Sequence, residues 1–125
     1  MLLGLVLCTC SLSSACSRKS DPEPDLVLTH EILPQPPRVG SASVSIDLTD
    51  RDGSPISGAK INVEGNMTHP GMAGVEGEAH EIGSGHYVAS LTFSMGGDWV
   101  LNVHGRLADG RTLTRQFDVK GVLPE

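Results

Sequence analysis

The sequence has few aromatic residues and no cysteine after position 16. Phe, Trp and Tyr make up 3% of its 125 residues, and the three cysteines are Cys8, Cys10 and Cys16. A disulfide scaffold and a cysteine-ligated metal site are therefore excluded for the rest of the chain, because both need thiols there. With so few aromatic side chains, Val, Ile and Leu must supply most of a core.

The chain also lacks an excess of positive charge and any helical pattern. Its formal net charge is −6 and no cluster of Lys or Arg is present, which excludes nucleic acid as a partner. No segment repeats apolar residues at helical spacing, whereas the 15 glycines and 8 prolines are typical of short strands joined by turns. The length allows one ordinary domain.

The N-terminus has the features of an export signal. Residues 1–15 contain a short apolar run, too short to remain across a bilayer, followed by small residues. The run ends at Leu12-Ser13-Ser14-Ala15-Cys16, which resembles the lipobox of bacterial lipoproteins. The resemblance implies acylation of Cys16 and a membrane-anchored protein outside the cytoplasm, on the periplasmic side or the cell surface. A plainly cleaved signal or a retained apolar tail is the alternative.

After Cys16 the composition changes twice. Residues 16–25 are polar and contain Pro22 and Pro24, which predicts a flexible tether. From Leu26 onward, apolar and polar residues alternate in short segments separated by turn residues. We therefore expect residues 26–121 to form the folded domain.

The alternation predicts seven strands. It is clearest over residues 42–48, and the others are expected at residues 26–33, 59–63, 75–82, 87–93, 99–103 and 113–119. Asp109-Gly110 is a strong hairpin signal between the last two. Short strands with turns about every ten residues indicate an all-β fold, an immunoglobulin-like antiparallel β-sandwich. Trp99, Tyr87 and Phe93 are expected to form much of its core.

One segment carries chemistry. Residues 65–74 place Met67, His69 and Met72 among glycines and a proline, where no strand or helix pattern identifies them as core. Thioethers and imidazole are soft or borderline ligands, which select copper, above all Cu(I), over magnesium or calcium. This segment therefore predicts a copper site.

Topology adds a fourth candidate ligand. If consecutive strands are antiparallel, the connections after the first, third and fifth strands lie at one end of the sandwich. The connection after the fifth strand contains Met95, which is thereby brought toward Met67, His69 and Met72. The resulting set of three thioethers and one imidazole suits Cu(I).

Other interpretations of the same residues remain open. The methionines can instead cap the open end of the sandwich, with Met95 in the core, or form a protein-contact surface. His80, His86 and His104 form an alternative zinc or Cu(II) set near the opposite end, whereas His30 lies within a strand. Asp98, which precedes Trp99, is interpreted as a turn residue that binds backbone amides.

Four segments together resemble the YtkA-like and FixH-like family of exported bacterial domains. They are residues 47–61, Met67-Thr68-His69-Pro70-Gly71-Met72, Gly85-His86-Tyr87 and Met95-Gly96-Gly97-Asp98-Trp99. The resemblance implies a role in copper handling or cytochrome oxidase assembly. Unlike FixH proteins, this sequence has no transmembrane helix.

No catalytic motif is present. The sequence has no nucleophile elbow, paired-acid pattern or phosphate-binding glycine loop in a suitable context, so we expect a protein that is not an enzyme. Two functions remain: a lipid-tethered domain that buffers or hands on copper, and an immunoglobulin-like interaction module. In the second, the same loop contacts an envelope protein such as a transporter or an oxidase assembly factor.

Overall fold

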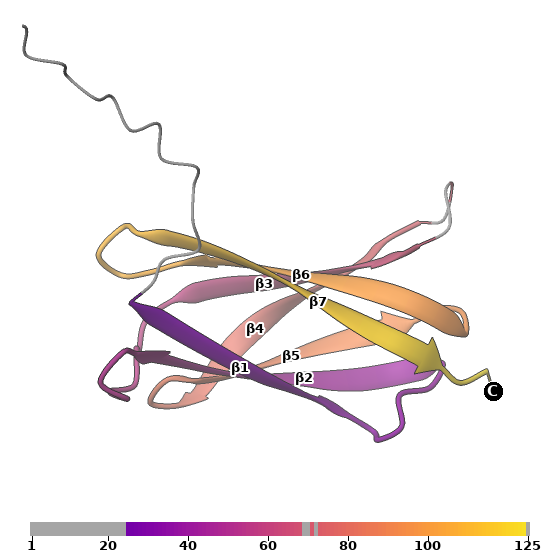
Figure 1. Cartoon of the computed structure of the whole chain (residues 1–125), viewed down its shortest axis with the longest axis horizontal. Helices are drawn as coiled ribbons and strands as arrows, with labels where there is room; N and C mark the ends of the chain where they lie inside the picture. The colour runs from indigo at the N-terminus through magenta and orange to yellow at the C-terminus, as the bar shows by residue number, and fades with distance from the viewer. Residues whose placement is uncertain (1–24, 69–70, 72, 125) are drawn as a thin grey trace, which may run out of the picture.

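The fold is an immunoglobulin-like antiparallel β-sandwich. A computed structural model describes residues 25–68, 71 and 73–124. Its strands are β1 (Leu26–Leu33), β2 (Gly40–Asp50), β3 (Lys60–Met67), β4 (Val75–Gly83), β5 (His86–Phe93), β6 (Gly97–Arg106) and β7 (Thr112–Val122) (Figure 1). All seven predicted strands are confirmed. In the described part of the chain there is no helix of the length and apolarity needed to cross a bilayer.

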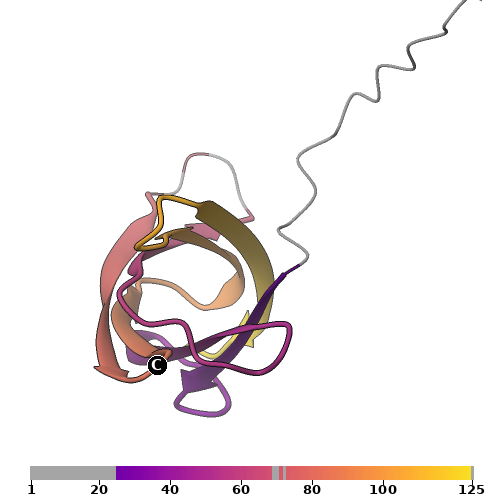
Figure 2. The same ribbon diagram turned by 90° about the vertical axis from the view of Figure 1, so that its left-hand side faces the viewer.

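The strands form one continuous, curled sheet in the order β1-β2-β5-β4-β3-β6-β7. Viewed from one end, they surround a single core (Figure 2). The first four strands in this order make one layer and the last three make the other, which is the strand arrangement of immunoglobulin constant domains.

β4 joins the two layers because it pairs with a different strand at each end. Its first half pairs with β3, from Val75 to Ala79, and its second half pairs with β5, from Ala79 to Gly83. Gly77 lies where β4 leaves β5, and an alanine Cβ there would be 2.3 Å from the Ser90 carbonyl oxygen. The absence of a side chain therefore lets β4 approach the β5 backbone closely.

The core contains the inward-facing residues of both layers. Trp99, Tyr87 and Phe93 are each at most 1% exposed, so the prediction that they form much of the core is confirmed. The rings of Phe93 and Trp99 meet edge to face, with centroids 5.3 Å apart. Small, β-branched and aliphatic side chains fill the remaining space, as the composition predicts.

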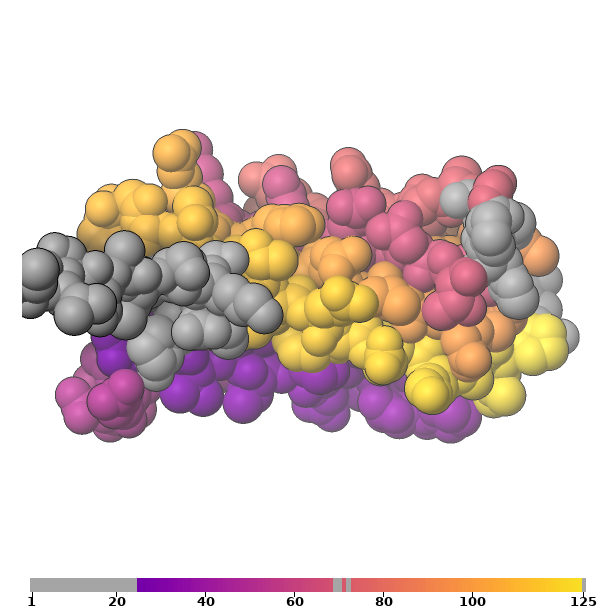
Figure 3. Space-filling model, turned by 45° about the horizontal axis from the view of Figure 1, so that its top comes forward, coloured from indigo at the N-terminus to yellow at the C-terminus, as the bar shows by residue number. Residues whose placement is uncertain are grey.

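The two edge strands of the curled sheet, β1 and β7, lie side by side (Figure 3). The imidazole of His30 on β1 stacks on the ring of Phe117 on β7, with centroids 3.8 Å apart. Arg115 Nη2 donates a 3.4 Å hydrogen bond to the Leu26 carbonyl oxygen. Beyond β1, Val39 N–H donates to the Leu123 carbonyl oxygen at 2.9 Å, which fixes the last residues of the chain to this edge.

The His30 contact predicts a dependence of stability on pH. Burial lowers the pKa of His30 from its ordinary value of 6.5. The folded protein therefore binds a proton at His30 less readily than the unfolded chain does. The stability that neutral His30 contributes is complete above pH 6.5 and decreases as pH falls below that value. We expect the urea midpoint of the wild type to fall between about pH 7.5 and 5.5 more steeply than that of His30→Gln. Equal slopes in the two proteins would contradict this assignment.

Candidate metal centre

The end of the sandwich with the methionines is formed by three connections and the end of the chain. These segments, called the methionine end below, are residues 34–39, the described part of 68–74, 94–96 and 123–124. Three contacts show that they are neighbours. Val39 N–H donates a 2.9 Å bond to the Leu123 carbonyl oxygen, and a Cβ on Gly96 would lie 3.1 Å from the Pro124 nitrogen. A Cβ on Gly97, directly after the β5–β6 turn, would lie 3.2 Å from the methyl group of Met67, directly before the β3–β4 connection. The prediction that the connections after β1, β3 and β5 share one end is confirmed.

Trp99 and Asp98 hold the β5–β6 turn in place. The indole Nε1–H of buried Trp99 donates a 2.9 Å hydrogen bond to the Met95 carbonyl oxygen. The Asp98 backbone oxygen accepts a 3.3 Å bond from Thr68 N–H, and its carboxylate accepts one of 3.0 Å from Gly121 N–H. Asp98 is therefore a residue that binds backbone amides, as predicted, and it connects the turn to β3 and β7.

Met67 lies in a strand, so its assignment to an irregular loop was wrong. It is the last residue of β3 and pairs with Trp99 of β6. The apolar alternation disappears after Val63 because the next inward position is Gly65, where a Cβ would come within 3.2 Å of Leu101 and 3.6 Å of Trp99. The side chains of Val75 and Leu101, with Trp99 beside them, occupy the space that an inward side chain of β3 would fill. Met67 itself is half-buried and packs against the core.

Met95 is exposed. The interpretation of this residue as part of the core is wrong, because 47% of its surface is accessible. The turn is anchored through the Met95 carbonyl oxygen and not through its side chain. Met95 thus lies at the surface, in the turn that leads to Gly97, where a Cβ would approach the Met67 methyl group.

Three of the predicted site residues lie outside the described residues. They are His69 and Met72, the other two candidate ligands in the β3–β4 connection, and Cys16, the predicted lipidation site. The flanks of that connection are described. Val75 pairs with Gly65, and Gly74 is so close to Asn66 that a Cβ would lie 2.6 Å from its side-chain oxygen. The two sides of the connection are thus held together at its base.

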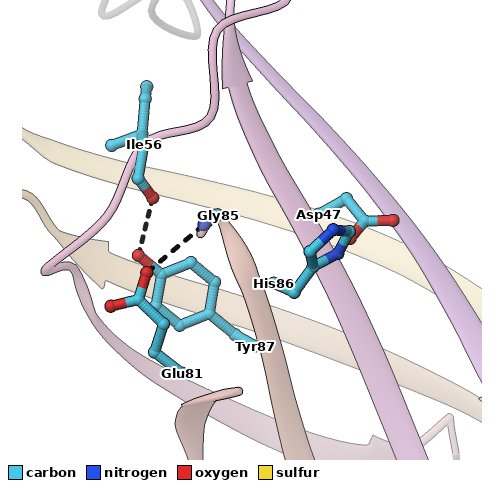
Figure 4. Close-up of polar contacts among 6 residues, drawn as sticks. All are labelled: Asp47, Ile56, Glu81, Gly85, His86 and Tyr87. Atoms are coloured by element: carbon cyan, nitrogen blue, oxygen red, sulfur yellow. Dashed lines mark hydrogen bonds and ion pairs between the residues drawn. The ribbon is translucent and has the colours of Figure 1, made fainter. Parts of the chain in front are cut away.

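A polar cluster at the opposite end fixes the β2–β3 connection. The Tyr87 hydroxyl donates a 2.7 Å hydrogen bond to the Ile56 carbonyl oxygen (Figure 4) and accepts one of 3.1 Å from Ala59 N–H. The Glu81 carboxylate accepts bonds from Gly58 N–H at 3.1 Å and from Gly85 N–H at 3.3 Å. Two side chains from β4 and β5 therefore immobilise a connection more than twenty residues away in the sequence.

This cluster changes the titration of both side chains. Hydrogen bonds to the Glu81 carboxylate lower its pKa, first from the Gly58 N–H and then from the Gly85 N–H and the Ser57 hydroxyl. Burial raises the pKa of Tyr87. Glu81 therefore accepts its hydrogen bonds as an ionised carboxylate, and Tyr87 donates its hydrogen bond as a neutral phenol.

The alternative set of His80, His86 and His104 is not brought together. His86 forms an exposed pair with Asp47 on the neighbouring strand β2 (Figure 4), whereas His104 lies 3.9 Å from Glu64 on the other layer. Within residues 25–68, 71 and 73–124, no three His, Cys, Asp or Glu side chains gather in a way that suits a metal ion. Sequence position placed these histidines near one end but did not reveal that they face outward from different layers.

Comparison with known proteins identifies one family and one similar structure. A family model described as YtkA-like matches residues 27–104. The crystal structure of a DUF4426 family protein from Pseudomonas aeruginosa is similar with a TM-score of 0.60 and 14% identity, over 81% of this chain and 93% of that one. At this identity the similarity supports the fold alone. The comparison with curated proteins gave no match.

Proposed function

The chain belongs to the YtkA-like family, and we propose that it is an extracytoplasmic, lipid-tethered domain that binds copper and buffers it or hands it on. The observation that carries the proposal is the meeting of two connections at the methionine end. Met67 at the end of β3 adjoins the turn that exposes Met95, although the two residues are far apart in the sequence.

The proposed ligands are Met67, His69, Met72 and Met95. Thioether sulfur is a soft ligand that prefers Cu(I), and an imidazole supports either oxidation state of copper. The end of β3 supplies Met67, the β3–β4 connection supplies His69 and Met72, and the β5–β6 turn supplies Met95. Bound copper would be cargo, and the proposal assigns the domain no catalytic reaction.

The proposed lipid anchor is compatible with access to this end. β1 begins at Leu26, at the end of the sandwich that carries Tyr87 and Glu81, and runs toward the methionine end. A tether attached through Cys16 therefore enters the domain opposite the proposed site. The site is then free to meet an envelope protein that delivers or receives copper.

A competition titration tests the proposal. The chain from Ser17 to Glu125 contains all seven strands and is titrated anaerobically with Cu(I) against a chromogenic chelator. We expect one copper ion per chain, held tightly enough to compete with the chelator. We expect this binding to be lost in the triple variant Met67→Ala, His69→Ala, Met72→Ala, because a single remaining thioether is a weak site.

The control replaces histidines that the structure places elsewhere. His86→Ala with His104→Ala removes two imidazoles on outward faces, and it is expected to leave Cu(I) binding unchanged. If the parent chain does not compete with the chelator, or if the control variant loses binding as well, the proposed copper site is wrong.

A second candidate function is supported by exposed apolar side chains at the same end. Met95 and Leu123 on the methionine end are 47% and 42% exposed, and Leu33, the last residue of β1 before this end, is 47% exposed. Such a surface suits an immunoglobulin-like module that contacts an envelope protein, such as a transporter or an oxidase assembly factor. Failure of copper binding together with retained folding would favour this function.

A further inference from the structure

Two of the proposed sulfur ligands lie among the described residues, and their environments differ. Met67 is half-buried, pairs with Trp99 between β3 and β6, and packs against the core. Met95 is 47% exposed in the turn between β5 and β6. One sulfur ligand therefore belongs to a residue that the core needs, and the other belongs to a residue at the surface.

The hydrogen bonds that hold the β5–β6 turn do not use the Met95 side chain. The Trp99 Nε1–H donates to the Met95 carbonyl oxygen at 2.9 Å. Asp98 joins the same turn to its neighbours by accepting from Thr68 N–H at 3.3 Å and from Gly121 N–H at 3.0 Å. A chemical change confined to the Met95 side chain therefore leaves all three hydrogen bonds in place.

The chemical change to which an exposed methionine is open is oxidation of its sulfur. A peroxide transfers one oxygen atom to the thioether: the O–O bond breaks, an S–O bond forms, the sulfur loses two electrons and the peroxide is reduced to water. The product, methionine sulfoxide, is polar, and methionine sulfoxide reductases convert it back to the thioether. Oxidation replaces a soft thioether ligand, which Cu(I) prefers, with a group whose accessible donor is a hard oxygen.

We propose that Met95 is a site of reversible oxidation by peroxide, and that its oxidation lowers the copper affinity of the domain. This inference rests on the proposed copper site. Met95 becomes a sulfoxide while Met67 remains a thioether, because packing against the core restricts access to Met67. The oxidised domain keeps its fold and loses one of its four proposed ligands.

Oxidation of Met67 would have a different result. Its methyl group lies 3.2 Å from the position of a Cβ on Gly97, and its strand partner Trp99 is 1% exposed. A sulfoxide at Met67 would place a polar group against this apolar packing, which costs stability. The two methionines are therefore distinguished twice, by how fast they are oxidised and by what their oxidation does to the fold.

Peptide mass spectrometry tests the selectivity of oxidation. The copper-free chain from Ser17 to Glu125 is treated with hydrogen peroxide and sampled over time. We expect sulfoxide to form at Met95 at least about fivefold faster than at Met67. The urea midpoint of protein in which Met95 is oxidised and Met67 is not is expected to equal that of untreated protein. Similar rates at the two methionines, or a lowered midpoint in that protein, overturn the proposal.

Anaerobic Cu(I) titration after removal of the peroxide tests the effect on the site. We expect the oxidised wild type to bind Cu(I) about tenfold more weakly than the untreated protein, and treatment with methionine sulfoxide reductase to restore the affinity. Met95→Leu is the matched control, because leucine is apolar and similar in size but has no sulfur. Its affinity is expected to change less than about twofold on peroxide treatment. An equal loss in Met95→Leu and the wild type would assign the effect to another sulfur and overturn the proposal.

The same titrations separate this proposal from the copper site on which it rests. If the untreated wild type does not compete with the chelator, the copper site is wrong and its control by Met95 is wrong with it. If the untreated wild type competes and the oxidised protein competes equally well, the copper site stands and the role of Met95 oxidation is wrong.

Discussion

Replacing Gly77 with alanine is expected to lower the free energy of unfolding by about 3 kcal/mol. The added Cβ would lie 2.3 Å from the Ser90 carbonyl oxygen and 3.2 Å from a Leu91 methyl group. The first of these atoms belongs to the backbone of β5, which cannot rotate away as a side chain can. Relief requires β4 to move off β5, at the point where β4 changes from one layer to the other.

Urea unfolding of the two alanine variants Gly77→Ala and Gly83→Ala tests this account. Gly83 lies on the same strand, but a Cβ there meets nothing closer than 3.6 Å and its backbone is not left-handed. The Gly83→Ala variant is therefore expected to stay within about 0.5 kcal/mol of the wild type. Equal effects at the two positions would mean that the approach of β4 to β5 is not as close as described.

Gly77 also shows what the sequence does not reveal. In the sequence it only weakens the alternation of the fourth strand, and the strand is still identified by its neighbours. That a single strand pairs with β3 over one half and with β5 over the other depends on the path of three strands in space. Local periodicity predicts that a strand exists, but it contains no information about which strand each half will pair with.

The strands whose inner faces are apolar were predicted with nearly their observed bounds. β2 alternates cleanly because one of its sides is buried, so a period of two is imposed on its sequence, whereas β1 has His30 at an inward position. β3 was predicted to end four residues early, since Gly65 occupies an inward position next to Trp99. A glycine that leaves room for side chains distant in the sequence interrupts the apolar alternation of its own strand. The strand then looks shorter in the sequence than it is in the structure.

For the candidate site, the sequence predicted which connections share one end of the sandwich but not how exposed their side chains are. Antiparallel connectivity was enough to place Met95 at the end that carries Met67, because that inference needs only the number and order of strands. It was not enough to predict that Met95 is exposed and Met67 half-buried. Those outcomes depend on the hydrogen bond of Trp99 to the turn and on the indole filling the end of the core.

The polar cluster around Tyr87 left only one weak signal in the sequence. Tyr87 was identified as a core residue by alternation, but its hydroxyl partners, Ile56 and Ala59, lie on a connection with no pattern of its own. Glu81 interrupts the apolar alternation of β4 at a position in line with Gly77 and Ala79, and an acid at such a position is the one clue that was available. Its partners are backbone amides, which any residue type provides.

Replacing Trp99 with alanine is expected to cost about 3–5 kcal/mol, a large part of the stability of a domain of this size. The indole is 1% exposed, stacks edge to face with Phe93 and fills the end of the core beneath the proposed copper site. Thermal or urea unfolding measures this loss. The more informative variant is Trp99→Phe, which keeps an aromatic ring but removes the N–H that binds the Met95 carbonyl oxygen.

Trp99→Phe separates the stability of the core from the positioning of Met95. We expect it to lose about 1–3 kcal/mol, since the carbonyl oxygen of the turn is left without its donor. If the turn positions Met95 as a ligand, Cu(I) affinity falls as well, on the order of tenfold. Phe93→Leu is the matched control, because it removes the ring that packs on Trp99 and leaves the hydrogen bond to the turn intact. A loss of affinity in Trp99→Phe but not in Phe93→Leu would assign Met95 to the site. Equal affinities would leave Met67 at the end of β3 and the β3–β4 connection as the only sources of ligands.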